Sequence, residues 1–184
     1  MMRIVSGTRR GKKLNTLAGE NTRPTLERVK QAFFNAIQFE ISDRIVLDLF
    51  AGSGQLGLEA LSRGAKYCFF NDMSKQACDV IRKNIDLCDF SELSQLTCKT
   101  YIECVKIIKS KGLKVSLIFL DPPYGKNLVN ESLAELKKND LLSNDAIIVC
   151  ESSADEQICI DSFYLHKEYK YSEIKITILK MKEN

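Results

Sequence analysis

Short runs of consecutive apolar residues alternate along most of the chain with stretches in which apolar residues recur at helical spacing. The runs cover residues 45–50, 66–72, 115–120 and 146–151, a weaker strand is predicted near 93–98, and the helical stretches cover 55–63, 77–88, 102–110 and 129–138. A strand that is apolar on both faces must be covered on both sides, which is typical of a parallel sheet between two layers of helices. The pattern therefore predicts an α/β, Rossmann-like fold.

The end of the chain follows a different rhythm. Residues 163–171 and 173–181 leave no room for a helix between them, and Ile174, Ile176 and Ile178 alternate with polar residues. Such alternation is typical of a strand with one solvated face. We therefore expect a C-terminal antiparallel hairpin that completes a mostly parallel, seven-stranded sheet.

The start of the chain is short, basic and interrupted by glycines. Residues 1–22 predict a small hairpin or an irregular arm, and Thr25 is a candidate cap for the helix that follows. No linker and no change in amino-acid composition divides the remaining residues into separate domains. We expect one domain over residues 1–184, with a basic arm and leading helix in 1–40 and the Rossmann-like core in 41–184.

Composition excludes several classes of protein. The seven cysteines are odd in number and contain no C-x-x-C pair, and His166 is the single histidine, so neither a disulfide framework nor a metal site is predicted. No apolar run approaches the roughly 20 residues that span a bilayer. The N-terminus lacks the apolar region of a signal peptide. A monomer in a reducing cytoplasm is expected, away from the membrane.

The basic charge is concentrated at the start of the chain. The net charge is +3, whereas residues 1–30 hold eight Lys or Arg and two Glu, a net +6, which leaves −3 for the remainder. A basic arm on a nearly neutral body favours a polyanionic partner such as a nucleic acid. Charge alone suits a solvated tail equally well.

A glycine turn follows the first apolar run and opens a helix. This is where open α/β sheets bind ligands, because glycine lets the backbone approach a ligand and the helix start offers free N–H groups. Asp72 ends the next run, where an acid can accept both ribose hydroxyls. The predicted cofactor contacts are Asp48, Phe50, Ala51, Gly52, Ser53, Gly54, Asp72 and Met73.

The glycine pattern alone does not decide between nucleoside cofactors. Gly52, Gly54 and Gly57 match G-x-G-x-x-G, so a dinucleotide stays open. Asp48 directly before the turn favours S-adenosylmethionine, since a carboxylate there can engage the amino-acid end of that ligand.

The motif Asp-Pro-Pro-Tyr ends the run at 115–120, on the same predicted edge of the sheet. An exocyclic base amine is a poor nucleophile because its lone pair is delocalised into the ring. Two acceptors on its N–H groups, a carboxylate and a carbonyl held rigidly by prolines, would aim that lone pair at a methyl group. An aromatic ring can stack on a flipped-out base. The predicted catalytic residues are Asp121, Pro122, Pro123 and Tyr124.

These motifs, together with Arg3-Ile4-Val5-Ser6-Gly7 and Thr22-Arg23-Pro24-Thr25, resemble the RsmD family. The resemblance implies a class I methyltransferase that transfers a methyl group from S-adenosylmethionine to the N2 amine of a guanine in 16S ribosomal RNA, leaving S-adenosylhomocysteine. The substrate would be the RNA within a small ribosomal subunit or an assembly intermediate. Two departures concern the cofactor: Ser74 replaces a usual second acid, and residues 97–101 lack an acid near the adenine.

The resemblance also implies that the basic arm holds RNA beside the site. For Arg23 a salt bridge at the helix start is an equally good interpretation. Two alternative functions stay open: a DNA adenine-N6 or cytosine-N4 methyltransferase, and a catalytically inactive RNA-binding assembly factor with the same fold. The predicted RNA contacts are Arg3, Arg9, Arg10, Lys12, Lys13, Arg23 and Arg28.

Overall fold

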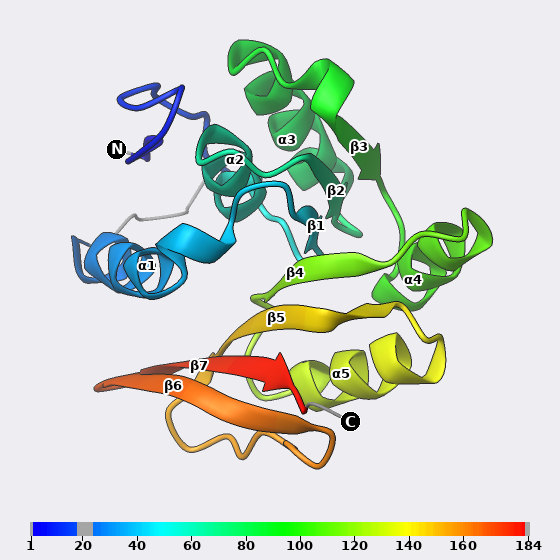
Figure 1. Cartoon of the computed structure of the whole chain (residues 1–184). Helices are drawn as coiled ribbons and strands as arrows, with labels where there is room; N and C mark the ends of the chain where they lie inside the picture. The colour runs from blue at the N-terminus through cyan, green and yellow to red at the C-terminus, as the bar shows by residue number, and fades with distance from the viewer. Residues whose placement is uncertain (1, 18–23, 183–184) are drawn as a thin grey trace.

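The computed structural model describes residues 2–17 and 24–182. Its strands form one mixed sheet (Figure 1). Its seven strands lie in the order β3-β2-β1-β4-β5-β7-β6. Strands β1 to β5 run parallel, and β7 is antiparallel to both of its neighbours. The predicted α/β fold with a C-terminal hairpin is confirmed. The strands are β1 (Ile45–Asp48), β2 (Tyr67–Asn71), β3 (Ser94–Thr97), β4 (Val115–Leu120), β5 (Leu142–Ser153), β6 (Phe163–Tyr171) and β7 (Ile174–Met181).

Helices cover both faces of the sheet, as the apolar strands require. Successive strand residues point to opposite faces. Val46 therefore packs in one buried cluster with α1 to α3, whereas Leu47 packs in a second cluster with α4 and α5. The helices are α1 (Pro24–Ala36), α2 (Gln55–Ser62), α3 (Lys75–Leu87), α4 (Tyr101–Ser110) and α5 (Leu128–Lys138), with short 3-10 turns η1 (Gln38–Glu40) and η2 (Ser91–Leu93).

The leading helix starts earlier than the sequence predicts. Helix α1 begins at Pro24, so Thr25 lies inside the helix and is not its cap. Proline is favoured in the first turn because its missing N–H has no intrahelical partner there and its φ is already helical. Within the described residues, no helix is long and apolar enough to cross a membrane.

The basic arm folds back as a tight hairpin and packs onto α2, so a freely solvated tail is wrong for residues 2–17. Met2, Ile4 and Leu14 are buried in the core. The buried Glu59 carboxylate on α2 accepts hydrogen bonds from the backbone N–H groups of Val5 (2.7 Å) and Ser6 (3.0 Å). Three apolar anchors and a charged acceptor thus fix the arm to the body.

Gly7 packs directly against the end of α2. Its φ is +80°, and a Cβ at this position would lie 1.8 Å from the Ser62 carbonyl oxygen. We expect Gly7→Ala to lower the free energy of unfolding by about 3 kcal/mol or more, because backbone atoms must separate. Gly11→Ala is the matched control, since φ there is +85° but nothing lies within 4 Å. Urea unfolding of both variants tests this, and equal losses would contradict it.

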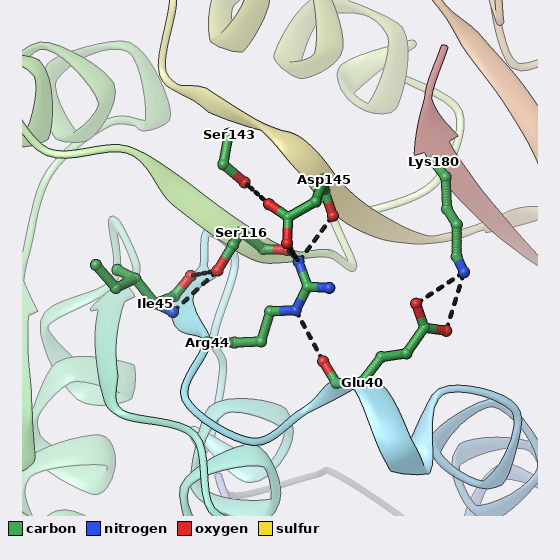
Figure 2. A network of polar contacts seen from close by, with 7 residues as sticks. All are labelled: Glu40, Arg44, Ile45, Ser116, Ser143, Asp145 and Lys180. Carbon is green, nitrogen blue, oxygen red and sulfur yellow. Dashed lines mark hydrogen bonds and ion pairs between the residues drawn. The ribbon is translucent and has the colours of Figure 1, made fainter. Parts of the chain in front are cut away.

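A polar network ties the amino-terminal ends of the central strands together, at the edge of the sheet away from the glycine turn (Figure 2). The Arg44 guanidinium donates to the carbonyl oxygens of Ser116 (3.0 Å) and Asp145 (2.7 Å) and pairs with the Asp145 carboxylate at 2.9 Å. Nearby, Lys180 on β7 pairs with Glu40 at 2.8 Å. These contacts fix β1, β4 and β5 relative to one another and leave their opposite ends free to form a site.

Candidate active site

The two predicted motifs meet in one cavity of about 760 Å³ at the carboxyl ends of the parallel strands. Gly52 after β1 and Asp121 after β4 both line it, because these strands are neighbours in the sheet. The side-by-side placement of the two loops is therefore confirmed. The other lining residues are Met2, Lys30, Asp48, Phe50, Ala51, Ser53, Gln55, Leu56, Asn71, Asp72, Met73, Lys99, Thr100, Tyr101, Ile102, Pro122, Pro123, Tyr124, Lys126, Leu128 and Glu151.

The glycine turn is fixed to the acid that ends β2. Gly52 has a φ of 55°, which favours glycine, and its N–H donates to the Asp72 carboxylate at 3.0 Å. The other carboxylate oxygen of Asp72 accepts the Ser74 N–H at 2.9 Å. Each oxygen keeps acceptor capacity for a ligand hydroxyl. Ser74 itself caps α3 by accepting the Ala77 N–H, which gives this departure from the family pattern a structural role.

The other two glycines of the turn serve the fold. Gly54 does not line the cavity; with φ at 79° it precedes α2. Gly57 packs α2 directly on the sheet, since a Cβ there would lie 2.3 Å from the Phe70 ring and 2.6 Å from the Cys68 sulfur. The third glycine of G-x-G-x-x-G is thus required for helix–sheet contact, which is needed whichever nucleoside binds.

Asp48 is almost completely buried at the base of the cavity. Its carboxylate accepts the Gly57 N–H at 2.9 Å. Burial raises the pKa of Asp48 to about 7, although the Gly57 hydrogen bond and the charge of Lys30 act in the opposite direction and Asp72 raises it slightly. The group is therefore held near the midpoint of its titration at neutral pH.

The Asp-Pro-Pro-Tyr motif forms the opposite wall. Asp121 is half-buried, Pro122 is buried, and Pro123 and Tyr124 are exposed. The Tyr124 hydroxyl donates to the carboxylate of Glu151 on β5 at 2.5 Å. Burial, followed by the bond and charge of Glu151, raises the pKa of Tyr124, so this hydroxyl stays protonated and acts as the donor.

Several lining residues were not predicted. Thr100 to Ile102 line the cavity next to the predicted ribose acid, and the ring of Tyr101 lies 5.9 Å from that of Phe50. The buried Asn71 joins the loops by donating to the carbonyl oxygens of Leu49 and Lys99. An apolar, aromatic wall therefore stands where the sequence lacks the usual acid. Glu151 was also missed, because it ends an apolar strand without any surrounding motif.

The predicted RNA contacts are spread over the surface. Arg9 donates to the Cys88 carbonyl oxygen at 2.7 Å and lies over the Phe90 ring, so it helps dock the arm on α3. Arg23 lies outside the described residues. Three lysines that were not predicted, Lys30, Lys99 and Lys126, line the cavity. The exposed members of the predicted set are Arg3, Arg10, Lys13 and Arg28, and Lys12 is half-buried.

Comparison with known proteins identifies the family. The family model described as "Conserved hypothetical protein 95" matches residues 2–180. A protein of Haemophilus influenzae named "Ribosomal RNA small subunit methyltransferase D" is 35% identical over 85% of this chain and 81% of its own. The chain belongs to the RsmD family. The resemblance found in the sequence is thereby confirmed.

A second protein of the same name and two solved structures are also similar to this chain. The Escherichia coli K12 protein of the same name is 32% identical over 84% of this chain and 76% of its own. The solved structure of yhhF from Escherichia coli superposes with a TM-score of 0.86 at 29% identity, covering 100% of this chain and 99% of that one. A SAM-dependent methyltransferase of Agrobacterium tumefaciens shares the fold with a TM-score of 0.59 at 19% identity, covering 74% of this chain and 47% of its own. The fold is that of class I methyltransferases.

Proposed function

We propose that this RsmD-family protein methylates the exocyclic N2 amine of a guanine in 16S ribosomal RNA, with S-adenosylmethionine as methyl donor. The observation that carries the proposal is that the glycine turn and residues 121–124 line one cavity. The curated relatives named ribosomal RNA small subunit methyltransferase D support RNA as the substrate.

The cavity fits an adenosyl amino acid in size and in chemistry. Its volume of about 760 Å³ lies within the usual range for small-molecule sites. Asp72 would accept the ribose hydroxyls, Phe50 and Tyr101 would cover the adenine, and Asp48 would face the ammonium of the amino-acid end. When bound, S-adenosylmethionine supplies a methyl group activated by a sulfonium, and the carbon–sulfur bond breaks as the carbon–nitrogen bond forms.

The chain's own residues would prepare the nucleophile. The Asp121 carboxylate and a prolyl carbonyl accept hydrogen bonds from the two N–H groups of the amine, which favours a pyramidal nitrogen with its lone pair on the methyl side. Tyr124 stacks on the extruded base, with its ring orientation fixed by Glu151. One amine proton leaves from the methylated nitrogen to Asp121 or to water. Catalysis then consists mainly of positioning.

Labelled methyl transfer tests the proposal directly. The protein is incubated with methyl-labelled S-adenosylmethionine and small ribosomal subunits from a strain that lacks the protein, and the RNA is digested to nucleosides. We expect label in N2-methylguanosine. Label in N6-methyladenine or N4-methylcytosine, or transfer only to DNA, would reject the guanine assignment. An inactive assembly factor would show no transfer to any base.

Exposed cations on the arm are proposed to bind RNA phosphates. We expect Arg3, Arg10 and Lys13, all changed to Gln, to raise KM for subunits by about one order of magnitude and to weaken its dependence on salt. kcat should change little, because none of the three lines the cavity. The matched control changes Lys106, Lys109 and Lys111, exposed residues at α4, to Gln. Equal effects from both triple variants would contradict a specific role for the arm.

A further inference from the structure

Glu151 is a buried carboxylate that the proposed mechanism uses only to hold a ring. The residue is 7% exposed near the carboxyl end of β5, and it lines the cavity. It forms no ion pair with any residue that the structure describes. Burying a carboxylate without an opposite charge is unfavourable. Its position beside residues 121–124 therefore indicates that it contacts a bound ligand.

The known contact of Glu151 leaves half of the carboxylate available. Oε1 accepts the Tyr124 hydroxyl. Across the described part of the chain, no other group donates to this carboxylate, whereas an ionised carboxylate can accept about four hydrogen bonds. Oε2 is therefore an acceptor inside the cavity, held in place by the Tyr124 bond.

The sheet places this acceptor next to Asp121. Leu120 on β4 is paired with Cys150 on β5, so Asp121, directly after β4, and Glu151 on β5 both follow this paired position. Neighbouring strands lie about 5 Å apart. Both carboxylates line the cavity in which the base amine is proposed to react. Such a pair matches a ligand edge that offers two adjacent donors.

Guanine offers that edge, and the other amine-bearing bases do not. Beside its exocyclic amine, guanine carries N1–H, which is a donor. Adenine and cytosine carry a ring nitrogen lone pair beside the amine, which a carboxylate would repel. We propose that Glu151 selects guanine by accepting N1–H through Oε2 while Asp121 accepts from the amine. This inference rests on the proposed function and names the group that determines its base specificity.

The test compares Glu151→Gln with Tyr124→Phe on undermethylated small subunits. Glu151→Gln keeps the size and the acceptor for Tyr124, but it can turn an N–H toward N1–H. Tyr124→Phe removes only the bond between Tyr124 and Glu151. We expect kcat/KM for guanine methylation to fall about 100-fold in Glu151→Gln and less than tenfold in Tyr124→Phe. Stabilisation by S-adenosylhomocysteine in a thermal shift should match the wild type in both.

Each outcome decides one of the two proposals. Equal losses in the two variants, or nearly normal activity of Glu151→Gln, would show that Glu151 only holds Tyr124 and would overturn the inference while guanine methylation stands. Wild-type protein that methylates no guanine would overturn the proposed function and the inference with it. If Glu151→Gln fails to fold, Glu151→Asp, which keeps the charge but shortens its reach, must show the same selective loss of kcat/KM.

Discussion

Asp121→Ala is expected to lower kcat about 1000-fold while the affinity for S-adenosylhomocysteine stays within a few-fold of the wild type. The carboxylate is proposed to accept a hydrogen bond that strengthens as the amine becomes pyramidal, and loss of one such transition-state contact typically lowers kcat by about 10²–10³. The substitution also removes a proton acceptor next to the amine nitrogen. Single-turnover methylation of undermethylated subunits measures the chemical step directly.

Asp121→Asn separates the two contributions of this side chain. The amide keeps one acceptor oxygen and the shape of the side chain, so we expect a loss intermediate between the wild type and Asp121→Ala. Thermal shift with S-adenosylhomocysteine controls for the fold and for the cofactor site. Nearly normal turnover of Asp121→Ala would remove this carboxylate from the mechanism.

The sequence was sufficient for the arrangement of the sheet. The central parallel strands β1, β4 and β5 contain apolar runs, and such runs tolerate only one environment, between two layers of helices. The same regularity placed the glycine turn and Asp121 at one edge, because parallel strands all end on the same side. The sequence pattern predicts helix boundaries less closely: α1 starts at Pro24, because proline is favoured in the first turn of a helix.

The site was predicted only where a motif marked it. Glu151 and Lys30 enter the cavity through tertiary packing, from β5 and α1, and neither belongs to the glycine turn or to the Asp-Pro-Pro-Tyr motif. The arm shows the opposite error. Its arginines were grouped by charge, yet Arg9 is engaged with the Cys88 carbonyl oxygen and the Phe90 ring. Charge pattern gives the sign of a surface but not the contacts of each side chain.

Asp48→Asn is expected to make the protein more stable at alkaline pH and to weaken binding of the cofactor. The folded pKa of Asp48 is about 7, against 3.8 for the ordinary group. Between these values the folded state binds more protons than the unfolded state, so the free energy of unfolding falls as pH rises from about 4 to 7. Above pH 7, the raised pKa of Asp48 lowers the free energy of unfolding by about 4 kcal/mol. Urea unfolding at pH 5 and pH 8 should show the variant gaining clearly more stability over the wild type at pH 8 than at pH 5.

The same carboxylate predicts a proton linked to cofactor binding. A cation brought beside Asp48 favours its ionised form and lowers its pKa, so binding of S-adenosylhomocysteine at pH 7 should release about half a proton. Calorimetry in two buffers with different ionisation enthalpies measures this number. Asp48→Asn should release none and bind about 100-fold more weakly, since it loses a charge-assisted contact. Equal proton release by the variant would assign the proton to another group. Because Lys30 and Asp72 act on the same carboxylate, Lys30→Met should raise the pKa of Asp48 and enlarge the proton release at pH 7.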